Sequence, residues 1–226
     1  METIQELIDK AISLEDIDHI KSYKWKPSLF GRCFRAQYWA RKGEAESNPV
    51  DRRTLRVFKA GKLFHDFVQG LLGGQREVLI ESDDVKGYAD VVRDNEVVDI
   101  KSQHSKAFWY MAKYKAPGDV IADKYPNWLQ VMYYARELKK EFGRLIFVSK
   151  DDLCIKEFVQ PFDEYWLEQI DTELRQLRHN WALQELPSAK PRCYMDKDGK
   201  SKECGYCNFR DKCAEIEARN EKNVAD

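Results

Sequence analysis

Residues 85–103 read VKGYADVVRDNEVVDIKSQ, two β-rich runs around the Asp-Asn pair at 94–95. Such a pair between runs of branched aliphatic residues predicts a hairpin with a two-residue loop. In that register Asp90 faces Asp99, and opposed side chains lie about 5 Å apart. Lys101 lies two residues beyond Asp99 and therefore points to the same face. The hairpin thus presents two carboxylates and one ammonium group from neighbouring backbone positions.

The polar residues of this hairpin have an apolar setting. Their neighbours are branched aliphatic side chains, namely Val91, Val92, Val97, Val98 and Ile100. Charged groups are rarely buried unless they are paired or bind a metal. Two adjacent carboxylates repel each other, and Mg²⁺, which favours one or two carboxylates plus waters and a phosphate oxygen, compensates that repulsion. The alternative is a solvated cross-strand ion pair, which contributes little to stability.

Composition is that of a water-soluble globular chain. The chain has 226 residues, of which 43% are apolar and 34% charged, and its net charge is -1. This length predicts one domain, and no apolar run approaches the length of a membrane helix. The first twenty residues are amphipathic and acidic, unlike a secretory signal. We therefore expect a cytoplasmic protein, in which six cysteines favour metal ligation over disulfides.

Apolar periodicity along the chain alternates between helical and strand patterns. Helices that flank a small central sheet predict a mixed α/β domain. We expect one domain over 1–226, with its core at about 50–185. The expected helices are 2–22, one opened by Pro27-Ser28, 52–72, 126–142 ending at Gly143, and 163–185. The expected strands are 76–81, the two of the hairpin, 145–149 and 154–160, and Pro117-Gly118 is expected to be a break.

The cysteines near the C-terminus form a second group. Cys204, Cys207 and Cys213 have the spacing C-x2-C-x5-C, with Cys193 eleven residues earlier and Cys33 far upstream. A CxxC pair with a third cysteine nearby predicts a metal site that needs a fourth ligand. If Cys33 completes the set, the metal joins the N-terminal part to the tail, as in an iron–sulfur clamp. If Cys193 completes it, the tail folds alone as a zinc knuckle.

Two helical segments carry polar residues of the kind found in active sites. His65 lies in an apolar helix, and a neutral imidazole is a good ligand for Mn²⁺-type ions, although such a histidine is usually structural. Gln130 and Tyr134 are four residues apart and share one helix face. Gln binds phosphate or water, and Tyr donates a hydrogen bond or stacks on a base. Taken alone, that pair is more often ordinary packing.

The order of these elements resembles the PD-(D/E)XK nuclease superfamily, and most of all its RecB-type branch. The matching elements are His65, the GYAD motif ending at Asp90, Asp99-Ile100-Lys101, and Gln130-x3-Tyr134. Residues 28–39, SLFGRCFRAQYW, together with the closing cysteines, resemble the iron–sulfur subset of that branch. That subset includes AddB-type helicase–nuclease domains, CRISPR-adaptation exonucleases and related phage exonucleases.

This resemblance implies a restriction-endonuclease-like core, a central mixed sheet flanked by helices. It implies a Mg²⁺ or Mn²⁺ site and a [4Fe–4S] cluster, with Zn²⁺ as the alternative. The expected divalent-ion ligands are His65, Asp90, Asp99 and the backbone carbonyl of Ile100. The expected cluster ligands are Cys33, Cys204, Cys207 and Cys213. The cluster would clamp residues 187–213 to the helix at 25–43.

The function that the resemblance implies is divalent-metal-dependent hydrolysis of phosphodiester bonds in DNA. We expect an exonuclease acting on single-stranded ends in recombination, repair or CRISPR adaptation, with recombination or CRISPR integration proteins as partners. Lys101 would orient water or stabilise negative charge, and Gln130 and Tyr134 would position the strand. Further DNA contacts are expected from Lys106, Trp109, Tyr110, Lys113, Tyr114 and Lys115. The alternative is a non-catalytic zinc- or cluster-containing module that binds nucleic acid.

Overall fold

The computed structural model describes residues 2–17, 23–114, 117–188 and 202–225. Its contacts divide the chain into two compact units. The sheet unit consists of 26–30 and 56–173, and the cysteine unit consists of 1–25, 31–55 and 174–226. None of the helices in the described ranges is both long and apolar enough to cross a membrane.

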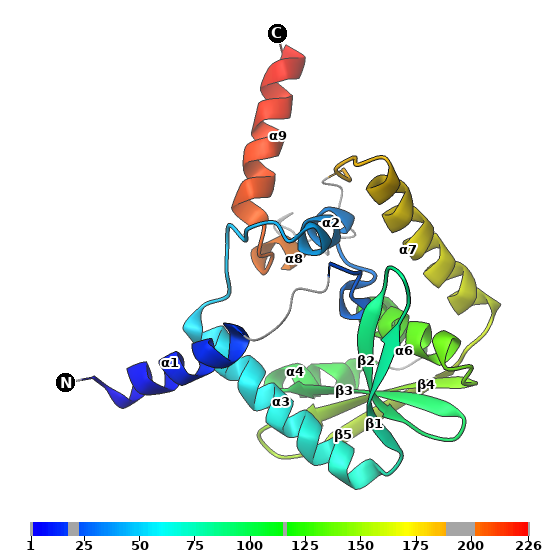
Figure 1. The fold of residues 1–226 in the computed structure, drawn as a ribbon. Coiled ribbons are helices and arrows are strands. Elements are labelled where there is room, and N and C mark those ends of the chain that lie inside the picture. Colours follow the sequence, from blue (N-terminus) through cyan, green and yellow to red (C-terminus); the bar gives the residue numbers. More distant parts are fainter. Residues whose placement is uncertain (1, 18–22, 115–116, 189–201, 226) are drawn as a thin grey trace. The chain divides into compact units, whose positions relative to one another are not determined.

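A five-stranded mixed sheet forms the centre of the sheet unit, as predicted (Figure 1). The strands are β1 Gln75–Glu81, β2 Lys86–Val92, β3 Glu96–Gln103, β4 Phe142–Ser149 and β5 Ile155–Pro161, and they lie in this order across the sheet. Neighbours are antiparallel except β3 and β4, which are parallel. The carboxyl ends of β3 and β4 therefore meet at one edge of the sheet.

The predicted hairpin register is confirmed at the loop end. Val91 pairs with Val98, Val92 pairs with Val97, and the amide of Arg93 donates to the carbonyl of Glu96 over 2.9 Å. Beyond these pairs, β2 continues along β1 as far as Lys86 and β3 continues along β4 as far as Gln103. The carboxylates of residues 90 and 99 thus lie where the two strands part.

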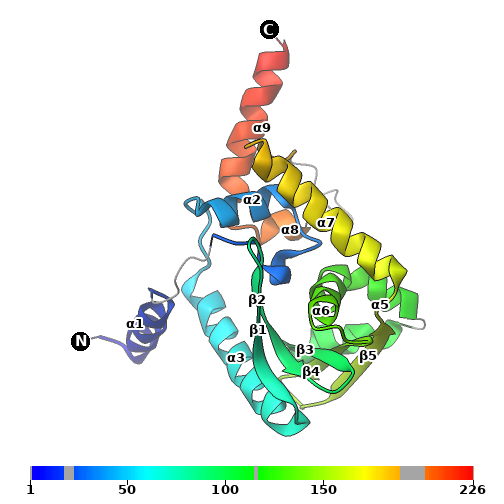
Figure 2. The ribbon, with the colours of Figure 1, turned by 45° about the vertical axis from the view of Figure 1, so that its right-hand side comes forward.

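Helices cover both faces of this sheet (Figures 1 and 2). Helix α3, Arg52–Leu72, packs Phe64, Val68 and Leu72, which lie four residues apart on one stripe, against one face. The strand residues beneath that stripe are Val91, Val98, Ile100, Ile146 and Val148. Helix α6, Tyr125–Glu137, covers β3 and β4 on the other face. Residues 99 and 101, which alternate with the α3-facing residues of β3, therefore face α6.

The expected helix over 126–142 is wrong at its C-terminal end. Helix α6 ends at Glu137, Lys139 has a φ of 53°, and Gly143 lies within β4. A Cβ on Gly143 would lie 3.0 Å from the Sδ and Cε atoms of Met132 and 3.1 Å from Val131. The glycine therefore allows a close approach of β4 to α6, and it does not end the helix.

Two other helix boundaries also differ from expectation. Pro27 opens only the 3₁₀ turn η1, Pro27–Leu29, and helix α2, Phe34–Lys42, begins after Gly31, which has a φ of 73°. Cys33 occupies the N-cap of α2. Pro117, expected at a break, begins helix α5, Pro117–Asp123, because proline is favoured at a first helical position. Helix α4, Ser105–Tyr110, and the turn η2, Met111–Lys113, precede it.

The cysteine unit is helical and has an aromatic core. Its helices are α1 Ile4–Ile17, α2, the end of α7 Glu164–Ala182, α8 Lys202–Gly205 and α9 Arg210–Ala225. Tyr38, Trp39 and Phe209 are buried together. The guanidinium of Arg41 lies 4.5 Å from the ring centroid of Trp25 and 4.2 Å from that of Trp181. Helices α2 and α8 and the start of α9 lie side by side in both ribbon views.

Candidate active site

Asp90 lies at the point where β2 and β3 part. Its Oδ2 atom accepts a hydrogen bond from the backbone amide of Ile100 over 2.7 Å. The carboxylate thereby satisfies an amide of β3 beyond the last paired residues of the hairpin. The Nδ1 atom of His65, on α3, lies 3.6 Å from the same oxygen. Three elements therefore converge on one carboxylate.

Asp99, Lys101 and Gln130 form the second part of the site. The Lys101 Nζ atom lies 2.9 Å from both Asp99 carboxylate oxygens, and it also donates to Gln130 Oε1 over 3.4 Å. The geometry with Asp99 Oδ1 is that of a hydrogen bond, whereas the solvent-shielded Oδ2 makes no hydrogen bond with the described residues. The strand and α6 thus hold the ammonium group between a carboxylate and an amide.

Burial perturbs the carboxyl group of Asp99. Its residue is only 1% exposed, and this burial raises the pKa of Asp99 to about 6. The positive charge of Lys101 opposes the shift, and the negative charge of Asp90 adds to it. A buried carboxylate oxygen that lacks a hydrogen bond costs free energy unless a cation or proton compensates it.

Tyr134 comes from the same face of α6 as Gln130. Burial, followed by the charges of Asp99 and Asp90, raises the pKa of the Tyr134 phenol. The phenol therefore stays protonated at neutral pH and remains a hydrogen-bond donor. A Cβ on Gly87, the glycine of the GYAD motif, would lie 2.5 Å from the Tyr134 hydroxyl oxygen. Glycine at this position leaves room for the phenol beside the carboxylates.

The residues around Asp90 and Asp99 form a candidate site for a divalent ion. Within the described ranges, no three His, Cys, Asp or Glu side chains are gathered as a ready-made metal site. Mg²⁺ nevertheless needs only one or two protein carboxylates, because it retains several waters. Asp90 and Asp99 supply these carboxylates, and Asp99 Oδ2 is buried without a hydrogen bond, with the Lys101 Nζ atom 2.9 Å away. The residues therefore fit a partly hydrated Mg²⁺ or Mn²⁺ ion, with His65 beside them.

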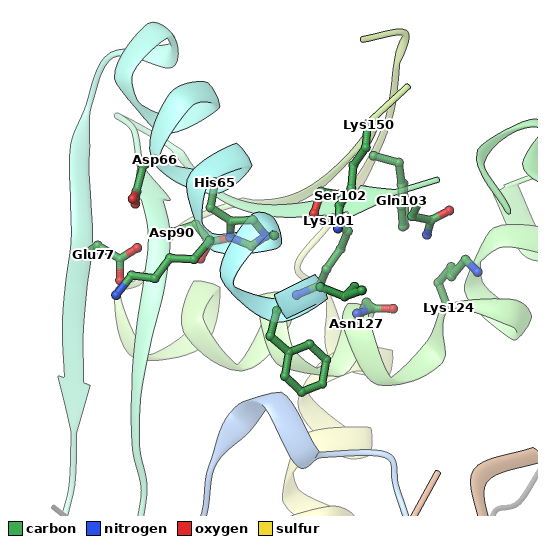
Figure 3. Close-up of a pocket in the computed structure, with 15 residues that line it drawn as sticks. His65, Asp66, Glu77, Asp90, Lys101, Ser102, Gln103, Lys124, Asn127 and Lys150 are labelled. Atoms are coloured by element: carbon green, nitrogen blue, oxygen red, sulfur yellow. The ribbon is translucent and has the colours of Figure 1, made fainter. Parts of the chain in front are cut away.

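A pocket of about 630 Å³ lies beside these groups, and Asp99, Gln130 and Tyr134 are not among the residues that line it (Figure 3). His65, Asp90 and Lys101 line it, together with residues that the sequence reasoning did not single out. These further residues include Asp66, Glu77, Ser102, Gln103, Lys124, Asn127 and Lys150. One signal was available for Lys150, because it directly follows β4 and the ends of parallel strands meet at one edge. Its amide donates to the Gln103 carbonyl over 2.7 Å.

The residues expected to contact DNA lie in and after α4. Trp109 and Tyr110 are 51% and 60% exposed, and the Lys113 Nζ atom lies 4.0 Å from the Tyr110 ring centroid. The hydroxyl of Tyr114 instead donates to Asp123, so that ring is engaged within the protein. Lys106 is exposed, and Lys115 lies outside the described residues.

In the cysteine unit, the structure brings Cys33 close to the C-terminal cysteines. The Cys33 amide donates to the Glu203 carboxylate over 2.8 Å. Burial raises the pKa of both Cys33 and Cys207, and the pKa of Cys33 is raised further by the charge of Cys207. Cys204 and Cys213 act on Cys207 in the same way. Cys193, the alternative fourth ligand, lies outside the described residues.

Hydrogen bonds to sulfur distinguish this group from ordinary buried thiols. Arg35 Nη1 lies 3.3 Å from Cys213 Sγ, and the amide of Phe209 donates to Cys207 Sγ over 3.4 Å. Arg35 is buried and also bonds the carbonyl of Pro187 and the carboxylate of Glu217. Donors around sulfur stabilise thiolates, the form that binds metal. None of the described cysteines forms a disulfide, and they are not arranged as a closed metal site.

Comparisons with known proteins place the fold. No family model matches the sequence, and no curated protein matches it either. The crystal structure of SSO0001 is similar to this chain with a TM-score of 0.54 and 18% identity, covering 92% of this chain and 95% of that one. LHK-Exo, an alkaline exonuclease from Laribacter hongkongensis, was solved in complex with dAMP. Its TM-score is 0.50 with 13% identity, over 73% of this chain and 90% of that chain. At these identities the likeness shows a shared fold.

Proposed function

We propose that this protein is a divalent-metal-dependent DNA exonuclease of the PD-(D/E)XK type, in its RecB-like branch. One observation carries the proposal: Asp90, Asp99, Lys101, Gln130 and Tyr134 converge beside a pocket, and a buried Asp99 oxygen lacks a hydrogen bond. The shared fold with an exonuclease that was crystallised with a nucleotide supports it.

Each group of the site has a role under this proposal. Asp90, Asp99, His65 and the carbonyl of Ile100 would hold Mg²⁺ or Mn²⁺, which supplies an activated water and polarises the phosphate. Lys101 is fixed by its carboxylate and amide partners and reaches the pocket, where its charge stabilises negative charge developing on phosphate oxygens.

Gln130 and Tyr134 have positioning roles under this proposal. Gln130 orients the Lys101 ammonium group through their hydrogen bond. The protonated phenol of Tyr134 is a donor close to both carboxylates.

Single-stranded DNA is the proposed substrate. The exposed rings of Trp109 and Tyr110 offer faces on which bases stack, and Lys106 and Lys113 offer positive charge. Stacking on aromatic side chains requires unpaired bases, which favours single-stranded ends over intact duplex. Action in recombination, repair or CRISPR adaptation, together with proteins of those processes, belongs to the same proposal.

We also propose that Cys33, Cys204, Cys207 and Cys213 hold a structural [4Fe–4S] cluster, with Zn²⁺ as the alternative. The support is their proximity and the hydrogen bonds donated to two of the sulfurs. In this proposal the group stabilises the cysteine unit and takes no part in hydrolysis.

The nuclease proposal is tested with end-labelled linear DNA, single- and double-stranded, and with circular single-stranded DNA. We expect Mg²⁺- or Mn²⁺-dependent shortening of linear strands and no cleavage of circles. Asp99→Asn and Lys101→Met should each lower kcat by about 100-fold or more, as loss of one charge-stabilising group typically does. Lys139→Met is the control, because Lys139 is exposed and does not line the pocket.

Three results would contradict the proposal. Cleavage that persists unchanged in Asp99→Asn removes the assigned site, and cleavage of circles makes the enzyme an endonuclease. DNA binding without hydrolysis, indifferent to Asp90→Asn and to divalent ions, would favour the non-catalytic binding module.

A further inference from the structure

The pocket has two ends of opposite charge. Figure 3 shows Asp66, Glu77 and Asp90 on one side, with Lys124 and Lys150 on the other side and Lys101 between the two groups. A single metal and a single phosphate would use only the end that holds the carboxylates and Lys101. The second group of lysines, Lys150 directly after β4 and Lys124 directly before α6, has no role in that chemistry.

Lys150 is the clearest element of this second group. Its ammonium group makes no ion pair with a carboxylate of the described residues, although the residue is half-buried. A Cβ on Gly61 of α3 would lie 3.8 Å from Lys150 Nζ and 3.5 Å from Ser102 Oγ. The ammonium group is therefore held beneath α3, at the wall of the pocket, and does not extend freely into solvent.

Lys124 and polar neutral groups complete this end. The Lys124 Nζ atom lies 2.7 Å from Asp123 Oδ2, and that carboxylate also accepts from the Tyr114 hydroxyl. Asp123 therefore keeps a donor when Lys124 turns to another anion. Asn127, on the first turns of α6, lines the same end and adds an amide donor. Lys150, which has no carboxylate partner among the described residues, and the Asn127 amide are donors suited to a phosphate group, and Lys124 would share its charge between Asp123 and that phosphate.

We propose that Lys150, Lys124 and Asn127 form a second phosphate subsite, which binds the phosphate next to the reacting one on the same DNA strand. This inference rests on the proposed nuclease function and deepens it, because the pocket would then bind two consecutive phosphates of one DNA strand. The subsite holds the strand in register, so that the reacting phosphate lies over Asp90, Asp99 and Lys101. A mononucleotide ester, which has one phosphate, cannot use it.

The test compares two substrates that differ in the number of phosphates. One is a short single-stranded oligonucleotide, and the other is the p-nitrophenyl ester of thymidine 5′-monophosphate, which contains only the reacting phosphate. Lys150→Gln should raise KM for the oligonucleotide roughly 10-fold, as loss of one charge-assisted contact implies, and leave the ester unchanged within about twofold. Lys124→Gln should act in the same direction, and Lys139→Gln should change neither substrate.

Binding gives a readout that does not need hydrolysis. In Ca²⁺ or EDTA, the slope of log affinity against log salt for the oligonucleotide should fall by about 0.7 in Lys150→Gln, the value for one phosphate contact of a single strand. If the wild type hydrolyses neither substrate, the nuclease proposal fails. The salt slope still shows whether Lys150 contacts a phosphate of the bound strand.

Two outcomes would overturn the subsite. An equal loss on the oligonucleotide and the ester would assign Lys150 to the reacting phosphate. A KM and a salt slope like those of Lys139→Gln would show that no phosphate binds there. Thermal melting of each variant checks that the fold is retained.

Discussion

The sheet unit and the cysteine unit gather their polar groups by different means. In the sheet unit, Asp90 and Ile100 are bonded across 10 positions of sequence, through strands whose pairing is fixed by buried valines. In the cysteine unit, Cys33 is bonded to Glu203 across 170 positions. Strand register and an apolar core suffice to place the first pair. The second contact joins two distant segments through polar groups, which is the situation in which a bound metal contributes most.

The carboxylates of the sheet unit also have more buried apolar residues around them than the cysteines of the cysteine unit have. The residues around the carboxylates on β2 and β3 belong to a continuous core under α3. Cys207 and Cys213 are only partly buried beside Trp39 and Phe209. We infer that the sheet unit keeps its site in the absence of ions, whereas the cysteine unit depends on its ligand.

The largest expected effect follows from this difference. Cys207→Ser and Cys33→Ser should each abolish the bound iron or zinc and destabilise the cysteine unit by several kcal/mol, because structural metal sites contribute roughly 10 kcal/mol of binding free energy to folding. Anaerobic purification, analysis of iron, sulfide and zinc, and denaturant unfolding measure these effects. Sulfide with iron indicates the [4Fe–4S] cluster, and zinc without sulfide indicates a zinc site.

Cys154→Ser is the matched control for the cysteine series. Cys154 lies directly before β5 in the sheet unit, so its replacement by serine should leave the metal content unchanged. A wild-type protein that is purified anaerobically without iron or zinc, and that unfolds like Cys207→Ser, would refute the idea that the cysteine unit depends on a metal. Retention of the metal in Cys33→Ser would instead favour Cys193 as the fourth ligand.

The second prediction concerns the free energy of unfolding that the sheet unit loses because Asp99 is buried and ionised. The pKa of Asp99, raised to about 6, means that the folded protein holds this proton more tightly than the unfolded chain does. Ionisation of Asp99 therefore destabilises the fold, fully above pH 7 and not at all below about pH 4. Asp99→Asn removes this cost and should stabilise the metal-free protein by about 3 kcal/mol at pH 8, with the gain disappearing toward pH 4.

Urea unfolding in EDTA at several pH values measures this gain. Mg²⁺ should stabilise the wild type and leave Asp99→Asn unchanged, since the ion compensates the same carboxylate. A variant less stable than the wild type at pH 8 would show that Asp99 and Lys101 form a favourable ion pair, and the case for a cation at Asp99 would be lost.

The sequence was sufficient to predict the hairpin, its register and the mixed α/β class. Two pairs of consecutive valines flank the Asp-Asn turn, and a two-residue loop pairs Val91 with Val98 and Val92 with Val97, which brings residues 90 and 99 to the point where the strands part. The spacing of Gln130 and Tyr134 likewise fixed their common helix face, which the structure directs to Asp99 and Lys101.

Other features could not be predicted because they depend on contacts between distant segments. The end of α6 was missed, since Gly143 is required by a contact with Met132 that only the folded sheet creates. Lys124 directly precedes α6 and Lys150 directly follows β4, and only the position of Lys150, at a strand end, carried a signal. The place of Lys150 beside the pocket follows from the parallel pairing of β3 and β4, and that of Lys124 follows from the packing of α6 on these strands. Local sequence determines neither contact.

The smallest expected effect is at Gly87, where the sheet unit has no spare room. A Cβ there would lie 2.5 Å from the Tyr134 hydroxyl oxygen and 2.9 Å from Pro27 Cδ. Gly87→Ala should therefore destabilise the protein by about 1–3 kcal/mol, as overpacking does, and should displace the phenol and lower kcat. Gly118→Ala is the control, because nothing lies within 4 Å of its added Cβ. Tyr134→Phe removes the oxygen, so the double variant should lose less stability than the sum of the two single variants, whereas strict additivity would show that Gly87 does not position Tyr134.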